Sequence, residues 1–284
     1  MNGTTSGESV EITTTDGRVL GGTLFRAGAG SRVIIVQGAT AVPHQFYRRF
    51  AAFMQQRGTT TLTYDFRGTG ESGPDSLKGY KAACSDWGLI DMPSVLDWVS
   101  HTLSPDKIYF VGHSAGGQQA GLIDKPELVD AMVTVCAQSG YWRYQGGAEK
   151  QRVFAMVYFF LPLVTRLFGY FPWSRFASGN DLPKDVALQW ARWCRHPDYL
   201  FSDSSLPLQR YKEFRAPVLA YSIDDDNWGT AKSVDALMQR AYANVERQHI
   251  VPSEHGLTKL GHMGFFRQGS ETLWQEVYDW LVYH

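Results

Sequence analysis

The sequence has no excess of charge of either sign. Its 284 residues include 27 Lys and Arg against 28 Asp and Glu, and the formal net charge is −1. No Lys or Arg run suggests a basic arm, whereas proteins that bind nucleic acid carry a basic patch or stripe. We therefore expect no nucleic-acid partner.

Cysteine is also scarce. The three cysteines, Cys84, Cys136 and Cys194, are widely spaced and form no C-x-x-C pair. This pattern disfavours a disulfide scaffold and a zinc site, so we expect three buried, small apolar side chains. We expect no metal and no organic cofactor.

No hydrophobic run is long enough for a membrane span. Residues 153–165 are uncharged, but Arg152 and Arg166 bracket them and Pro162 interrupts them. A spanning helix needs about 20 apolar residues, so we predict a buried or interfacial helix and no transmembrane segment. Residues 1–17 lack the basic and apolar regions of a secretion signal, which favours a cytoplasmic protein.

Hydrophobic segments are nevertheless present in a regular order, and 44% of the residues are hydrophobic. Residues 10–15 and 19–25 predict a hairpin that turns at Asp16-Gly17. Short apolar runs then alternate with helical patterns, which predicts βαβ units and a mainly parallel sheet. The expected strands are 32–37, 59–65, 107–111, 131–137, 218–223 and 247–251, and the expected helices are 44–57, 85–103, 116–123, 233–242 and 272–283.

The alternation stops over residues 141–200, which hold 15 of the 39 aromatic residues. We predict a sheet domain made of residues 1–140 and 201–284, with a helical, aromatic-rich lid at 141–200. Ligands of open α/β sheets bind at the carboxyl ends of the strands, where this lid would cover the site. The segment also has eight Lys and Arg against four acids. That balance fits an anionic substrate, an anionic membrane surface or a solvated face.

Residues 112–116 read Gly-His-Ser-Ala-Gly, between an expected strand and an expected helix. In this context the G-x-S-x-G pattern predicts a tight turn that exposes Ser114 as a nucleophile. The glycines two positions before and after the serine prevent clashes across the turn. His113 is expected to shape the turn.

A serine nucleophile needs a base, and the base needs an acid that orients it. In this architecture the acid follows the serine along the chain. Residues 224–226 are all aspartate and follow the strand 218–223 directly. We favour Asp226 as the acid, with Asp225 second, and the alternatives are a solvated loop or a cation site.

The base is expected in the loop before the last helix. His262 lies there, directly after Gly261, and His255 is its competitor. Four other histidines, His44, His101, His196 and His284, are expected to pack in the core or lie on the surface.

Acyl transfer also needs two backbone donors for the oxyanion. The amide of Ala115, directly after the nucleophile, is one candidate. The amide of Ala39, after the strand 32–37, is the other, although Gly38 could simply terminate that strand.

Taken together, these segments resemble the α/β-hydrolase superfamily, and most closely a bacterial group of predicted serine hydrolases. The resemblance covers nearly the whole chain and includes residues 64–72 (YDFRGTGES), 112–117 (GHSAGG) and 261–267 (GHMGFFR). The chain is similar, less closely, to lysophospholipases and monoacylglycerol lipases, which share a helical lid. It departs from its relatives at Gln37, where His is frequent, and at Thr40-Ala41, where a second glycine is common. Both departures fall in the oxyanion loop.

The resemblance implies an α/β-hydrolase fold, and the serine narrows the chemistry. Relatives that cleave halides or epoxides use a carboxylate at position 114, and dienelactone hydrolases use a cysteine. We predict a serine hydrolase that cleaves a small or medium apolar carboxylic ester through an acyl-enzyme. A thioesterase or acyltransferase with the same triad is the alternative, and a non-catalytic ligand-binding protein on the same fold is a third hypothesis.

Overall fold

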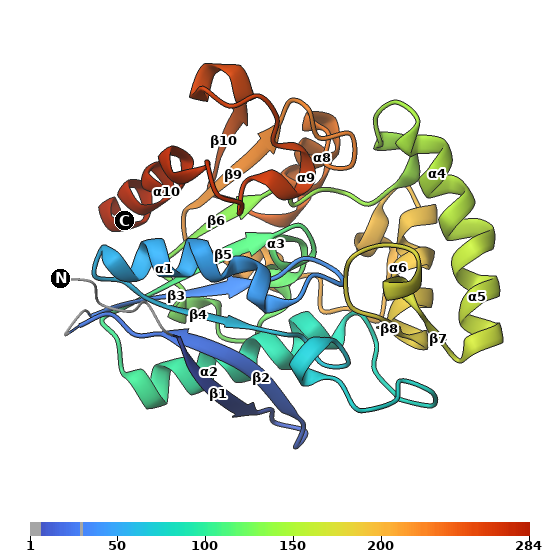
Figure 1. The fold of residues 1–284 in the computed structure, drawn as a ribbon, viewed down its shortest axis with the longest axis horizontal. Coiled ribbons are helices and arrows are strands. Elements are labelled where there is room, and N and C mark those ends of the chain that lie inside the picture. Colours follow the sequence, from blue (N-terminus) through green and yellow to red (C-terminus); the bar gives the residue numbers. More distant parts are fainter. Residues whose placement is uncertain (1–6, 29–30) are drawn as a thin grey trace.

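An eight-stranded sheet forms the centre of the molecule (Figure 1). The computed structural model describes residues 7–28 and 31–284; residues 1–6, part of the segment that argued against a secretion signal, lie outside the described residues. The strands run in the order β1-β2-β4-β3-β5-β6-β9-β10. Their bounds are β1 Glu8–Thr13, β2 Val19–Phe25, β3 Arg32–Gln37, β4 Thr60–Tyr64, β5 Lys107–His113, β6 Ala131–Val135, β9 Val218–Ile223 and β10 Val245–Ile250.

The predicted mainly parallel sheet is confirmed. The β1–β2 hairpin is antiparallel and β2 pairs antiparallel with β4, whereas all the other pairs are parallel. Strand β6 ends two residues earlier than the sequence predicts, because Cys136 takes a φ of 51°. This left-handed conformation is uncommon for a residue with a side chain, and it turns the chain out of the sheet.

Helices cover both faces of the sheet, as expected for parallel strands (Figure 1). One hydrophobic core lies between the sheet and α1 and α10, and includes Phe50 and Trp274. The other contains Val95 of α2 and Leu237 of α8. The helices of this domain are α1 Arg48–Gln56, α2 Met92–Leu103, α3 Ala115–Gln119, α7 Arg210–Glu213, α8 Ala231–Ala241, α9 Gly261–Gly264 and α10 Glu271–Tyr283.

Residues 141–200 form a separate layer of helices beyond the carboxyl ends of the parallel strands (Figure 1). A 20-residue helix, Glu149–Phe168, comprises α4 Glu149–Ala155, the π-helical turn Met156–Phe160 and α5 Leu161–Phe168. A short ribbon, β7 Tyr170–Phe171 with β8 Leu182–Pro183, connects it to α6 Lys184–Arg195. By length and composition alone, the 20-residue helix could cross a membrane. It is longer than the predicted segment 153–165.

Candidate active site

Ser114 lies on the turn between β5 and α3, with φ 49° and ψ −113°. Such a conformation is strained for a residue with a side chain and persists only where the surroundings impose it. Here the Ser114 amide donates to the Val135 carbonyl of the adjacent strand at 2.9 Å. The serine is therefore held at the carboxyl end of the central strand by the sheet itself.

The glycines around Ser114 are required by close backbone contacts. A Cβ atom on Gly116 would lie 2.0 Å from the Gln37 carbonyl oxygen, and one on Gly112 would lie 2.6 Å from Gly117. Both distances are far below van der Waals contact. The spacing of the two glycines therefore reflects the packing of the turn against β3 and α3.

His262 and Asp226 come from different loops and meet in a short hydrogen bond. The distance from His262 Nδ1 to Asp226 Oδ2 is 2.7 Å. Burial alone would raise the pKa of Asp226, but the charge and the hydrogen bond of His262 outweigh it and lower this pKa to about 2. Asp226 is therefore a carboxylate at neutral pH, and it fixes the proton of His262 on Nδ1.

The other two aspartates of the run have different partners. Asp225 accepts the backbone amides of Leu260 and Gly261 at 3.0 and 2.7 Å, so it anchors the loop that carries His262. Asp224 is exposed beside His249. His255, the competing base, pairs with Glu276 on α10.

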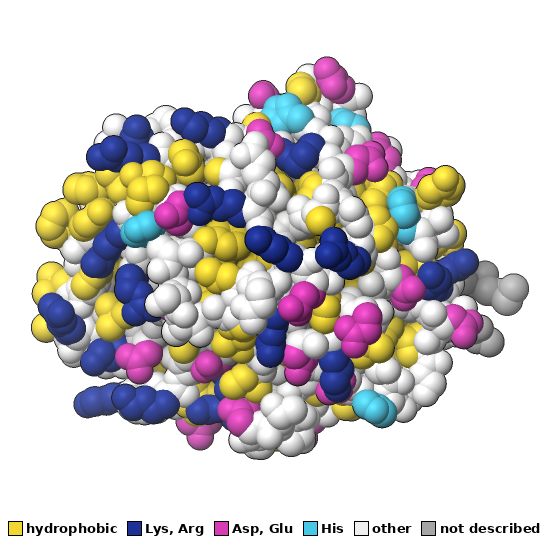
Figure 2. Space-filling view, turned by 180° about the vertical axis from the view of Figure 1, so that it is seen from behind, with side chains coloured by type: hydrophobic (Ala, Val, Ile, Leu, Met, Phe, Trp, Pro, Cys, Tyr) yellow, Lys and Arg dark blue, Asp and Glu magenta, His cyan; other side chains and the backbone are white. Residues whose placement is uncertain are grey.

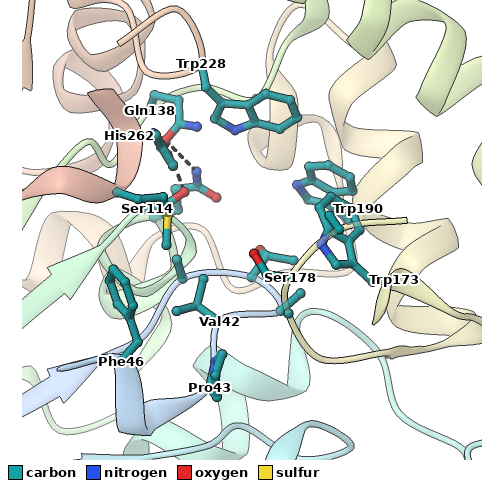
Figure 3. A pocket seen from close by; sticks show the side chains of 18 of the residues that line it. Val42, Pro43, Phe46, Ser114, Gln138, Trp173, Ser178, Trp190, Trp228 and His262 are labelled. Atoms are coloured by element: carbon teal, nitrogen blue, oxygen red, sulfur yellow. Dashed lines mark hydrogen bonds between the residues drawn. The ribbon is translucent and has the colours of Figure 1, made fainter. Parts of the chain in front are cut away.

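Ser114 faces the same cavity as His262, but its hydroxyl is directed elsewhere (Figure 3). The Ser114 Oγ lies 3.5 Å from the side-chain amide of Gln138, and among the described residues no hydrogen bond joins Ser114 to His262. Catalytic hydrogen bonds are often long or poorly aligned in free enzymes and tighten when substrate binds.

His113, beside the nucleophile, is in the middle of a buried chain of hydrogen bonds. Its Nε2 lies 2.9 Å from the His262 carbonyl oxygen, and its Nδ1 lies 2.9 Å from the Tyr47 hydroxyl. A carbonyl only accepts, so Nε2 carries the proton, and Tyr47 then donates to Nδ1. Burial, together with the nearby His262, lowers the pKa of His113 to about 3. His113 is therefore neutral and connects the nucleophile turn to the His262 loop.

The same series of hydrogen bonds extends to the predicted oxyanion loop after β3. The Ala39 amide, one of the two predicted oxyanion donors, donates to the Tyr47 hydroxyl at 2.8 Å. The Ala115 amide, the other, is the first of α3, where amides have no partner within the helix. The Ala39 amide is therefore already hydrogen-bonded in this structure, whereas an oxyanion donor must be free to bind the substrate oxygen.

Cys136 adds a thiol to the acid and the base. One ligand atom from each of Cys136, Asp226 and His262 lies within 4.8 Å of the others. A metal ion there would have to replace the His262–Asp226 hydrogen bond. Burial, and after it the charge of Asp226, raises the pKa of the Cys136 thiol, so it remains protonated beside the carboxylate.

The cavity around Ser114 has a volume of about 440 Å³ and is largely apolar. In Figure 3, Gln138, His262 and Trp228 lie on one side of it, and Trp173 and Trp190 of the 141–200 segment lie opposite. Val42, Pro43 and Phe46 close it from below. A cavity of this size holds a small molecule, with few polar groups to orient it.

Comparison with known proteins identifies the family. The family model described as "Alpha/beta hydrolase family" matches residues 33–273. The chain belongs to the alpha/beta hydrolase family.

Among solved structures, an esterase from Pyrococcus furiosus is similar, with a TM-score of 0.65 and 19% identity over 98% of this chain and 91% of that one. The alpha/beta hydrolase GrgF from Penicillium has a TM-score of 0.65 and 19% identity over 98% and 99% of the two chains. An esterase from Exiguobacterium antarcticum has a TM-score of 0.62 and 13% identity over 97% and 100%. At these identities the likeness concerns the fold. The search of curated proteins found no match.

Several residues that shape the site of this alpha/beta hydrolase were not identified from the sequence. Gln138 lies three residues after the end of β6, and its side chain is 3.2 Å from that of Gln118. Gln118 in turn accepts a hydrogen bond from the Tyr199 hydroxyl at 2.9 Å. The Gln138 amide is best oriented with its oxygen toward Trp228, where it accepts the indole N–H at 3.0 Å, and its nitrogen then faces Gln118 and Ser114. The position of Gln138 in the sequence could have identified it, because a polar residue directly after a predicted central strand lies at the carboxyl edge of the sheet, where ligands bind.

Proposed function

We propose that this alpha/beta hydrolase is a serine hydrolase that cleaves a small or medium apolar carboxylic ester through an acyl-enzyme. The observation that carries the proposal is the 2.7 Å bond from buried Asp226 to His262, which lines the same cavity as Ser114 on its strained turn. Family membership supports hydrolysis as the reaction class. The apolar cavity supports an apolar substrate.

In the proposed mechanism Ser114 rotates away from Gln138, and its Oγ attacks the ester carbonyl. His262 Nε2 takes the serine proton and returns it to the leaving alcohol, while Asp226 stabilises the imidazolium that forms. The Ala115 amide and an amide of the loop after β3 hold the oxyanion. Ala39 serves there only if its hydrogen bond to Tyr47 is exchanged or shared. Water then attacks the acyl-enzyme, and His262 repeats the two proton transfers.

The 141–200 segment is proposed to act as the lid of this site. Trp173, Ser178 and Trp190 come from it and form the wall opposite the triad. Trp190 also stacks on Trp228, with ring centroids 6.2 Å apart. The lid thereby gives the acyl or aryl group of the ester an aromatic surface.

The first experiment is covalent labelling with a fluorophosphonate, followed by intact mass and peptide mapping. We expect one adduct on Ser114, none in Ser114→Ala, and a much slower reaction in His262→Ala. A screen of ester and thioester chain lengths, with added alcohols and amines, then identifies the leaving group and the acyl acceptor. A folded protein that binds ligands in the cavity but never forms the adduct would replace the hydrolase proposal with the ligand-binding one.

A further inference from the structure

The outer surface of the lid is apolar to an unusual degree. Among the described residues nine large hydrophobic side chains are exposed, and seven of them lie between residues 158 and 176. We call these seven side chains the lid face; they are Tyr158, Phe159, Phe160, Leu163, Leu167, Phe168 and Phe176. Exposed apolar patches of this kind mark surfaces that bind a partner.

The helix that carries the lid face is apolar on both sides. Val153, Val157 and Leu161 are fully buried against the rest of the molecule. On the opposite side Phe159, Leu163 and Leu167, spaced by four residues, are 64, 59 and 72% exposed. A surface helix of a water-facing protein places polar residues there. This pattern indicates a second apolar environment on the outside.

The charges around the lid face are mainly basic. Residues 149–181 contain Lys150, Arg152, Arg166 and Arg175 against two acids at the ends of the segment, Glu149, which pairs with Arg152 at 2.5 Å, and Asp181. Arg175 lies over the ring of Phe168 at 5.3 Å. In Figure 2, where α4 and α5 lie at the left, hydrophobic and basic side chains are interspersed and acidic ones are few. The complementary partner is apolar and anionic.

We infer that the lid face binds an anionic lipid surface, with the helix Glu149–Phe168 lying along it. Helices of this kind bury their apolar face at the headgroup boundary while Lys and Arg contact anionic headgroups. The helix does not cross the bilayer, because only 13 uncharged residues separate Arg152 from Arg166 and a span needs about 20. Its inner side is, moreover, packed against the protein.

A second copy of the chain fits the lid face less well. A two-fold contact places the same patch of each copy against the other, so the Arg side chains of the two copies would gather at one interface. Like charges brought together oppose such a contact. An anionic lipid surface meets the same residues with opposite charge.

The lid face is continuous with the cavity. The ring of Phe176 lies 5.0 Å from that of Phe160, and the next residues, Ala177 and Ser178, line the cavity beside Trp173. A lipid surface on the lid face would therefore lie next to the cavity wall. The inference goes beyond the proposed function and is tested without turnover.

The test is co-sedimentation with vesicles of phosphatidylcholine, alone or with about one third phosphatidylglycerol. We expect the protein to bind the anionic vesicles and to be released as NaCl is raised. Changing Phe159, Leu163 and Leu167 to Ser, or Arg152, Arg166 and Arg175 to Gln, should each weaken binding about tenfold or more. Val19→Ser with Tyr283→Ser, which alters the other two large hydrophobic side chains exposed in the described part of the chain, should bind as wild type.

Thermal melts check that each variant is folded, and the single change Leu167→Asp replaces the triple variant if that one unfolds. Wild type that ignores anionic vesicles overturns the inference, as does a folded Phe159, Leu163 and Leu167 variant that binds normally. Light scattering measures the molar mass in solution and so tests whether two copies of the chain associate through the lid face. A wild-type dimer that the same three changes dissociate, with no vesicle binding, would assign the lid face to self-association.

Discussion

His113 contacts no substrate atom in the proposed mechanism, yet it joins three parts of the site. It links Tyr47, and through Tyr47 the Ala39 amide, to the carbonyl of His262. Every member of this chain is satisfied only while the His113 ring is neutral, because Nδ1 must accept while Nε2 donates. The chain therefore couples the geometry of the oxyanion loop to the protonation of one buried histidine.

This coupling predicts acid sensitivity. The pKa of His113 is about 3 in the folded protein, against about 6.5 in the unfolded chain, so between these values only the unfolded chain binds the proton. Stability is therefore lost as the pH falls from about 6.5 toward 3. Urea unfolding at pH 7.5 and pH 5 should show wild type losing about 2 kcal/mol more than His113→Asn. An equal loss in the two proteins would mean that His113 is protonated in the folded state.

Asp226 and Asp225 are adjacent in sequence but differ in what they contact. Asp226→Asn removes the carboxylate that fixes the tautomer of His262, so we expect the labelling rate or kcat to fall about 10³- to 10⁴-fold with the fold intact. Asp225→Asn instead weakens the acceptors of the Leu260 and Gly261 amides. Asp225→Asn should therefore lower Tm, and its loss of activity should be smaller than that of Asp226→Asn. The reverse ranking of the two variants in activity would make Asp225 the catalytic acid.

At the scale of elements, the turn from β5 to α3 is the most constrained connection in the site. Strand β5 pairs with β3 and β6, and the Ser114 amide adds one more bond to β6. The first turn of α3 then crosses so close to β3 that Gly116 faces the Gln37 carbonyl. Contacts among β3, β6 and α3 thus determine the backbone angles of Ser114.

A methyl group at this crossing should disrupt it. In Gly116→Ala the new Cβ atom would lie 2.0 Å from a backbone oxygen, so β3 or α3 must move. We expect a loss of several kcal/mol of stability, measured by urea unfolding, and loss of fluorophosphonate labelling in any folded fraction. Gly28→Ala, where the methyl would meet nothing within 4 Å, is the matched control. Normal labelling of Gly116→Ala would show that the turn tolerates a shift.

At the scale of the whole molecule, Arg67 joins the amino-terminal hairpin to the parallel sheet. It is almost fully buried, and its Nε lies 2.6 Å from Asp91 at the start of the α2 region. The far end of its guanidinium binds Asp16, in the β1–β2 turn, at 2.8 and 3.0 Å. A single side chain thereby links segments about 50 and 24 residues away in sequence.

Arg67→Met should leave Asp91 buried without its counter-charge. The expected cost is about 3–5 kcal/mol, visible in urea unfolding, because an uncompensated buried charge is strongly unfavourable. The double variant Arg67→Met with Asp91→Leu should recover much of that loss. Labelling of Ser114 should persist in both while they are folded. A loss of no more than about 1 kcal/mol in the single variant would mean that water or another cation replaces Arg67.

The sequence by itself determined the fold class and the order of its elements. Apolar runs of five or six residues, punctuated by Gly and Asp, encode strands locally, and their alternation with helical patterns leaves few topologies other than a parallel sheet. It also identified Ser114, the run 224–226 and His262 as the candidate triad, because strand order and chain order constrain where such residues fall.

Only the tertiary structure decided which groups touch. Asp226 rather than Asp225 contacts His262, the Ser114 hydroxyl is directed at Gln138, and Ala39 donates to Tyr47. Likewise, apolar residues lie on two opposite sides of the helix 149–168, and packing against α6 decided that the side with Val157 and Leu161 is buried. These outcomes depend on distances between segments far apart in sequence, which no local pattern of residues encodes.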